Sequence, residues 1–148
     1  MSVHAINKRA LFDYEILETY EAGIELFGLE VKAIKTGHIN LSGAYVVIKG
    51  NEAWLLNATV PPYQPKNTPP DYEPSRSRRL LLKKQEIREL VGKFAQKGLT
   101  LTPLRVYDKK SRIKLEFGLA RHKKEHDKRE TIKAREAERE IERTMKIE

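Results

Sequence analysis

Residues 12–26 read FDYEILETYEAGIEL, and this stretch decides the fold class. Its even positions are mostly large and apolar, whereas its odd positions carry most of the acids. Alternation with a period of two over this length predicts a β-strand with one buried face. Gly23 lies inside the strand, where it allows the sharp bend that a small barrel needs at a corner.

Four further strands are predicted downstream. They are apolar or alternating in pattern and span residues 45–48, 53–56, 99–107 and 113–119. The pair Gly50-Asn51 suits a tight hairpin turn between the first two of them. Pro103 has no N–H to donate, which favours an edge position or a bulge for the third.

Two helices are predicted among the strands, at residues 29–36 and before Gly98. The second is the clearer, because its apolar residues recur at i, i+3, i+4 and i+7. These residues are Ile87, Leu90, Val91 and Phe94. We expect a mainly β protein, an OB-type closed barrel of about six strands with two helices. The barrel is expected at residues 11–121, with an N-terminal arm at 1–10 and a basic tail at 122–148.

Charge indicates the class of partner. The 148 residues include 29 Lys and Arg against 21 Asp and Glu, a net charge of +8. This excess favours nucleic acid or another anionic surface. The chain has no cysteine, which excludes disulfides and thiolate zinc sites. It has neither a membrane-spanning apolar run nor the apolar core of a signal peptide, so we expect a soluble cytoplasmic protein.

The segment 76–84 is a basic cluster within the expected barrel. It holds no acid and five cations: Arg76, Arg78, Arg79, Lys83 and Lys84. One interpretation is a solvated loop before a helix, and the other is a contact with RNA phosphates, which arginine binds with two parallel hydrogen bonds. Leu80-Leu81-Leu82 is expected to pack into the barrel, or to leave one leucine exposed against an unstacked base. The segment Asn7-Lys8-Arg9 has the same two interpretations as the cluster.

The run RHKKEHDKR at residues 121–129 joins the end of the barrel to the tail. Five of these nine residues are Lys or Arg, and burying them without partners would cost too much free energy, so the run is on the surface. The rest of the tail has too few large apolar residues to bury a helix face and is expected to be disordered when free. If it became helical, an arginine stripe would form along one face, which suits folding on an RNA surface. The stripe consists of Arg135, Arg139 and Arg143.

Residues 122–126 match the H-x-x-E-H pattern of zinc peptidases. The surroundings are cationic, no apolar residues wall off a cavity, and no third ligand is marked. We therefore predict no metal. The sequence also has no Gly-rich phosphate loop, no nucleophile-plus-base arrangement and no isolated carboxylate pair, so we predict no cofactor and no enzymatic activity. Exposure of both histidines is the simplest interpretation, and stacking of His126 on a base is another.

Several separated motifs in one order resemble the SmpB family, the SsrA-binding proteins of bacterial trans-translation. The resemblance covers residues 7–145. Its motifs are NKRA at 7–10, YEAGI at 20–24, GLEVKAI at 28–34, PSRSRRLLL at 74–82, PL at 103–104 with Tyr107, and KK at 123–124 through DKR at 127–129. The chain has His122 where the family usually has glycine, and His126 where it often has tyrosine.

The resemblance implies a non-enzymatic, monomeric adaptor whose OB-type barrel binds the tRNA-like part of tmRNA (SsrA RNA). With elongation factor Tu, which joins through alanylated tmRNA, the adaptor enters stalled ribosomes. The tail becomes helical in the empty mRNA channel and replaces codon–anticodon pairing. A general OB-fold RNA-binding or ribosome-associated protein without a rescue role is the second hypothesis, and a zinc hydrolase built on His122 and His126 is the third.

Site residues carried over by motif are Asn7, Glu21, Leu81 and Lys114 on the tmRNA-binding surface. The cations expected to bind RNA beside them are Lys8, Arg9, Arg76, Arg78, Arg79, Lys83, Arg121, Lys123 and Lys124. His126 is expected near the decoding centre of the ribosome. The tail residues expected in or before the channel are Asp127, Lys128, Arg129, Lys133, Arg135, Arg139 and Arg143.

Overall fold

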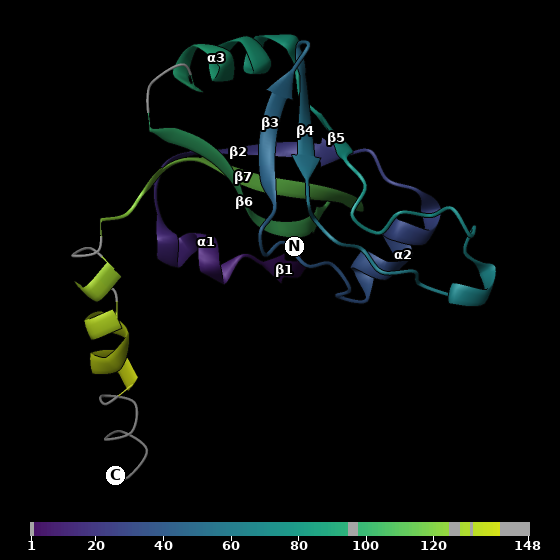
Figure 1. The fold of residues 1–148 in the computed structure, drawn as a ribbon, viewed down its shortest axis with the longest axis horizontal. Coiled ribbons are helices and arrows are strands. Elements are labelled where there is room, and N and C mark those ends of the chain that lie inside the picture. The colour runs from purple at the N-terminus through teal and green to yellow at the C-terminus, as the bar shows by residue number, and fades with distance from the viewer. Residues whose placement is uncertain (1, 95–97, 125–127, 131, 140–148) are drawn as a thin grey trace.

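The computed structural model describes residues 2–94, 98–124, 128–130 and 132–139. Figure 1 shows its elements around a curved sheet, with the tail leaving beside the first helix. In chain order they are β1 (Val3–Ile6), α1 (Lys8–Asp13), β2 (Tyr14–Ile24), α2 (Gly28–Lys35), β3 (Tyr45–Lys49), β4 (Glu52–Leu56), a 3₁₀ turn (Pro65–Asn67), β5 (Arg78–Leu81), α3 (Lys84–Phe94), β6 (Leu99–Lys109) and β7 (Arg112–His122). Residues 128–130 and 132–139 are also helical.

Seven strands in the described part of the chain form one antiparallel sheet in the order β1-β6-β3-β4-β5-β2-β7. Because β6 also pairs with β7, six of these strands close into a ring, and β1 adds to the edge of β6. The pairing of β3 with β6 rests on one residue pair, Val46 with Leu101, so the ring is nearly rather than fully closed. The expectation of a mainly β fold is confirmed.

The strand expected from Phe12 begins two residues later, at Tyr14. Phe12 and Asp13 instead end α1. A bulge between Ile16 and Glu18 shifts the alternation, and Ala22 and Ile24 then face the core. A bulge lets a long strand bend, as a ring requires.

The interpretation of residues 1–10 as an arm is wrong for their described part, residues 2–10. Val3–Ile6 pairs with β6 as β1. Asn7 begins α1, because its side-chain oxygen accepts a hydrogen bond from the Ala10 N–H at 3.2 Å, the usual role of a helix N-cap. Its amide nitrogen donates to the Pro103 carbonyl at 2.9 Å, which ties α1 to β6.

Two local predictions are confirmed, a hairpin turn at Gly50-Asn51 and a bulge at Pro103. Gly50 and Asn51 have φ angles of 59° and 62°, and they join β3 to β4 by the left-handed backbone that a tight hairpin needs. Pro103 lies at an irregularity in the β6–β7 pairing, between Pro103 and Arg105. The proline therefore occupies a bulge, where its missing N–H costs no ladder hydrogen bond.

The core fills the ring and extends under the helices. Inside it lie Leu55, Leu101, Leu115 and Phe117, all fully buried. α2 buries Ala33 and Ile34. α3 buries Ile87 and Leu90, but Val91 and Phe94 on the same predicted face remain 48% and 37% exposed. Figure 1 shows α3 beside the β3–β4 turn, with α1 and α2 at the other end of the ring.

None of the helices in the part of the chain that the structure describes is long and apolar enough to cross a membrane.

Candidate nucleic-acid interface

Strand β5 divides the cationic cluster between two faces of the sheet. Successive side chains of a strand point to opposite faces. Arg78 and Leu80 therefore point inward and are buried, whereas Arg79 and Leu81 point outward. The structure thus separates two cations that are neighbours in the sequence.

Arg78 is fully buried and pairs with Glu30 of α2, which is also fully buried. Its Nη2 and Nε donate to Glu30 Oε2 at 2.5 Å and 2.9 Å. Its remaining donors reach backbone carbonyls of Ala58 at 2.8 Å, Pro74 at 2.9 Å and Arg76 at 3.0 Å. The prediction that Arg78 binds RNA is therefore wrong, because its guanidinium has no exposed surface and its donors are already used.

Two further side chains complete this buried network. Arg76 Nη2 donates to Glu30 Oε1 at 2.5 Å, and the Tyr72 hydroxyl donates to Glu30 Oε2 at 3.1 Å. Arg76 also lies over the ring of Phe27, 3.9 Å from its centroid. The network joins α2, the proline-rich loop and the start of β5, so Arg76 is mainly a structural residue with 23% of its side chain exposed.

The pKa of Glu30 reflects this setting. Burial raises it, but the hydrogen bonds from Arg76, from the Phe27 N–H and from Arg78 outweigh burial and leave the pKa below its usual value. Glu30 is therefore an ionised carboxylate inside the fold. The sequence carried a signal for it, since Glu30 shares a helix face with Ala33 and Ile34, and an acid on a buried face requires a cationic partner.

A row of residues crosses β5, β2 and β7 on the outer face of the sheet. Gly23 of β2 pairs with Leu81 on one side and with Lys114 on the other. Leu81 is 51% exposed, so this row places a large apolar side chain on the outer face of the sheet. A Cβ on Gly23 would lie 3.3 Å from the Leu81 Cβ, so glycine leaves the room that this leucine occupies. We call Leu81, Gly23 and Lys114 the outer row.

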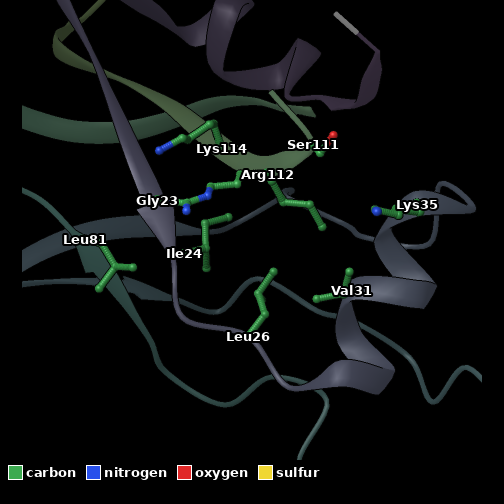
Figure 2. A pocket seen from close by; sticks show the side chains of 10 residues that line it. Gly23, Ile24, Leu26, Val31, Lys35, Leu81, Ser111, Arg112 and Lys114 are labelled. Carbon is green, nitrogen blue, oxygen red and sulfur yellow. The ribbon is translucent and has the colours of Figure 1, made fainter. Parts of the chain in front are cut away.

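Two shallow pockets meet at the outer row. The first lies toward α2 and has a volume of about 380 Å³. Figure 2 shows apolar side chains of Leu26 and Val31 in it, with Lys35 of α2 and Arg112 of β7 around them. None of the described residues that line it is an acid. Cations around an apolar surface suit a nucleotide, which combines a flat base with a phosphate.

The second pocket lies toward α3 and has a volume of about 400 Å³. Arg79 and Lys83 line it together with Glu21 and Glu52. Arg79 Nη2 lies 3.5 Å from Glu52 Oε1, and both side chains are more than 40% exposed. The structure therefore brings Arg79 and Lys83 next to Glu21, Leu81 and Lys114.

Glu21 is held in place beside the outer row. Its carboxylate accepts hydrogen bonds from the Tyr107 hydroxyl and from Lys109 Nζ, the latter at 3.2 Å. The hydrogen bond from Tyr107 is the main cause that lowers the pKa of Glu21, and Lys109 and Lys114 lower it further. Glu21 thus presents a fixed negative charge among cations, which can accept hydrogen bonds from base amino groups or ribose hydroxyls.

Other predicted residues gather elsewhere, around α1. Asn7 is buried and caps this helix. Arg9 is exposed and lies 3.4 Å from Asp13. Arg121 Nε lies 3.8 Å from Glu15, and the Lys123 N–H donates to the Asp13 carbonyl at 2.8 Å. Lys8 and Lys124 are exposed in the same part of the molecule.

The tail residues fall partly outside the described residues, which include neither His126, Asp127 nor Arg143. Lys128 and Arg129 are helical. Lys133, Arg135 and Arg139 lie in the helical segment 132–139, whose residues are all exposed.

The zinc pattern receives no support from its described members. His122 packs edge-on against Tyr14, with the ring centroids 5.2 Å apart. Glu125 and His126 lie outside the described residues. Within residues 2–94, 98–124, 128–130 and 132–139, no three His, Asp or Glu side chains are grouped to hold a metal ion.

Comparison with known proteins points to one family. The family model described as "SmpB protein" matches residues 4–147. The SsrA-binding protein of Thermosynechococcus vestitus is 53% identical over 95% of this chain and 92% of its own length. That of Trichodesmium erythraeum is 54% identical over 95% of this chain and 90% of its own.

A solved structure is also similar. It is described as "tmRNA-SmpB: a journey to the center of the bacterial ribosome" and superimposes with a TM-score of 0.68 at 45% sequence identity. The match covers 84% of this chain and 87% of that one.

Proposed function

Because the chain belongs to the SmpB family, we propose that it is a non-enzymatic RNA-binding adaptor of trans-translation, which binds tmRNA and acts with it on the ribosome. The observation that carries this proposal is the 53% identity to an SsrA-binding protein over 95% of the chain. The similar solved structure, whose description names tmRNA, SmpB and the ribosome, supports the same function.

The outer row and its two pockets form the proposed tmRNA surface, on a ring that we interpret as an OB-type barrel. Lys35, Arg112 and Lys114 would contact phosphates, which position the RNA. Leu81 would contact an unstacked base, because it is half exposed between two pockets. The bound RNA would be the tRNA-like part of tmRNA, whose folded shape offers both phosphates and unpaired bases.

The α1 region and the tail form the proposed ribosome-facing part. Lys8, Arg9, Arg121, Lys123 and Lys124, which the sequence predicts to bind RNA, would contact RNA from this part of the molecule. The tail would be mostly unfolded in free solution, since residues 132–139 are all exposed and a short helix in water has little to stabilise it. It would become helical in the empty mRNA channel, with His126 near the decoding centre. Elongation factor Tu would join only through alanylated tmRNA.

A binding competition tests the function. Labelled tmRNA is bound to the full chain at fixed salt, and unlabelled bulk tRNA is added in excess. We expect tmRNA to remain bound, because the family's RNA has features beyond the transfer-RNA shape. Equal competition by tRNA would instead favour a general RNA-binding protein.

A truncation tests the division of labour. Ending the chain after Lys124 keeps β7 and all of the outer row. We expect tmRNA binding to persist and tagging in a reconstituted trans-translation assay to stop. Loss of tmRNA binding by the truncated chain would contradict the assignment of the RNA surface to the ring.

A further inference from the structure

The tail contacts the folded part at the carboxyl end of α1. The Lys123 N–H donates to the Asp13 carbonyl at 2.8 Å, and Lys123 Nζ donates to the Leu11 carbonyl at 3.3 Å. Further along, Lys128 Nζ lies 3.3 Å from Asp13 Oδ1. The side chains of this pair are only 26% and 19% exposed, so water screens their attraction incompletely.

Phe12 adds an aromatic surface to the same place. Lys128 Nζ lies 5.9 Å from the centroid of its ring, and the Arg135 guanidinium lies 5.6 Å from it. These cations are seven residues apart, which is two helical turns, so a helical tail presents both on one face. A cation over an aromatic face is attracted by the ring quadrupole.

The helix that carries Phe12 and Asp13 is fixed to the ring. The Asn7 N–H donates to the Leu104 carbonyl at 2.7 Å, and the Asn7 side chain donates to the Pro103 carbonyl at 2.9 Å. Asp13 is further oriented by Arg9, whose Nε lies 3.4 Å from Oδ2. The position of α1 therefore determines where a tail helix bound to it would point.

We propose that Phe12 and Asp13 form a docking surface for the helical tail segments 128–130 and 132–139 and act as positioning residues that set the direction of the tail from the ring. The proposal rests on the proposed function for what the tail does once oriented. Figure 1 shows α1 and the helical tail on one side of the molecule and α2 on the other. A tail docked on α1 thus leaves the pocket between α2 and the outer row free for RNA.

The contacts between the tail and α1 are few, so this docking is weak. One ion pair and two cation–π contacts leave residues 132–139 exposed, so docked and undocked tails exchange. The docked state biases the orientation of the tail before the tail meets the ribosome. The tail can leave α1 without disrupting the hydrophobic core of the ring.

A distance measurement tests the proposal on the full chain. The protein has no cysteine, so Ser77→Cys and Glu138→Cys introduce two unique labelling sites, both on exposed residues. Paired spin labels should give a narrow distance component from the docked tail. In the variant Phe12→Leu/Asp13→Lys, that component should fall about twofold to fivefold, the factor expected for losing exposed cation–π contacts.

A charge exchange separates docking from simple damage. Asp13→Lys with Lys128→Asp restores the attraction in reverse and should recover the narrow component in part. Glu15→Lys is the matched control, since Glu15 is an exposed acid near α1 whose partner, Arg121, precedes the tail. A distance distribution in Phe12→Leu/Asp13→Lys that matches that of the unmodified chain would overturn the proposal.

Activity gives the second measurement. The variant Phe12→Leu/Asp13→Lys should bind tmRNA as the unmodified chain does but tag stalled ribosomes about threefold more slowly, in line with the lost docking. Unaltered tagging would overturn the positioning role. Failure of the unmodified chain to bind tmRNA would instead overturn the proposed function, so the two failures are distinguishable.

Discussion

Arg78 and Arg79 are adjacent in the sequence and lie in opposite regions of the molecule. Arg78 is inside, where it uses its donors on Glu30 and on backbone carbonyls. Arg79 is outside, 47% exposed, with carboxylates of Glu25 and Glu52 at 4.0 Å and 3.5 Å. A cationic motif that looks like one RNA-binding patch thus contributes Arg78 to a buried structural network and Arg79 to the surface.

The two regions differ in the free energy that is lost when a charged side chain loses its partner. A buried charge that loses its partner costs several kcal/mol, because water cannot replace the lost interaction. An exposed ion pair contributes about 0–1 kcal/mol, because water and salt screen it. Changes inside the network should therefore act on folding, and changes at the outer row should act on RNA binding.

The largest expected effect is that of Arg78→Ala. It removes the fully buried partner of the Glu30 carboxylate and should lower the free energy of unfolding by about 3–5 kcal/mol. Urea denaturation at pH 7 measures it. Arg79→Ala is the matched control one residue away and should change the same quantity by less than about 1 kcal/mol. Equal losses in the two variants would erase the distinction between the regions.

The second-largest effect is expected from acid, which should lower the free energy of unfolding by protonating the buried Glu30. The pKa of Glu30 is lower in the folded chain than its ordinary value of 4.5, so its contribution is complete above that pH. The contribution is lost as the pH falls through the lowered folded pKa. Unfolding free energies measured from pH 6 down to pH 3 should therefore fall less steeply in Glu30→Gln than in the unmodified chain. The effect is smaller than that of Arg78→Ala because a protonated Glu30 keeps part of its hydrogen bonding.

At the outer row, Leu81→Glu should weaken tmRNA binding by about tenfold, or about 1.4 kcal/mol. It removes an apolar contact and places a negative charge near phosphates. Leu81 is half exposed, so unfolding in urea should be nearly unchanged. Tight binding by this variant would remove Leu81 from the interface, whereas a large loss of stability would move it to the structural region.

The smallest effect is expected for Lys114→Gln. The slope of log affinity for tmRNA against log salt concentration should fall by about 0.7–0.9, the change for one lost phosphate contact. Lys66→Gln is a suitable control, because Lys66 lies in the 3₁₀ turn of the proline-rich loop. An unaltered slope in Lys114→Gln would show that this lysine contacts no phosphate.

Much of the fold was predictable, because local patterns determine it. Alternation in residues 12–26 predicted most of β2, the pair Gly50-Asn51 predicted a hairpin, and the spacing from Ile87 predicted α3. β1 was not predicted, since four residues show no usable alternation. α1 was missed because it is six residues long, although Asn7 is a good N-cap.

The candidate site was predictable only in part. The motifs named Leu81, Lys114 and Glu21, which the pairing of strands brings together, and Asn7, which is buried at the start of α1. RNA binding by these residues stays a prediction. The inward direction of Arg78 depends on the start of β5 and on Glu30, which lies 48 residues earlier in the chain. The contact of Phe12 with Arg135 spans most of the chain. Such long-range partners have no signature in a local pattern.

The single pair of Val46 with Leu101 makes the boundary between β3 and β6 the thinnest part of the ring. A sheet yields first where fewest bonds hold it, so amide hydrogen exchange should begin along this seam. The β3–β4 hairpin would swing out as a unit, while β2, β6 and β7 stay protected by their long mutual pairing. The ring would then open first at this seam, while β2 and β7, which carry Gly23 and Lys114 of the outer row, stay paired.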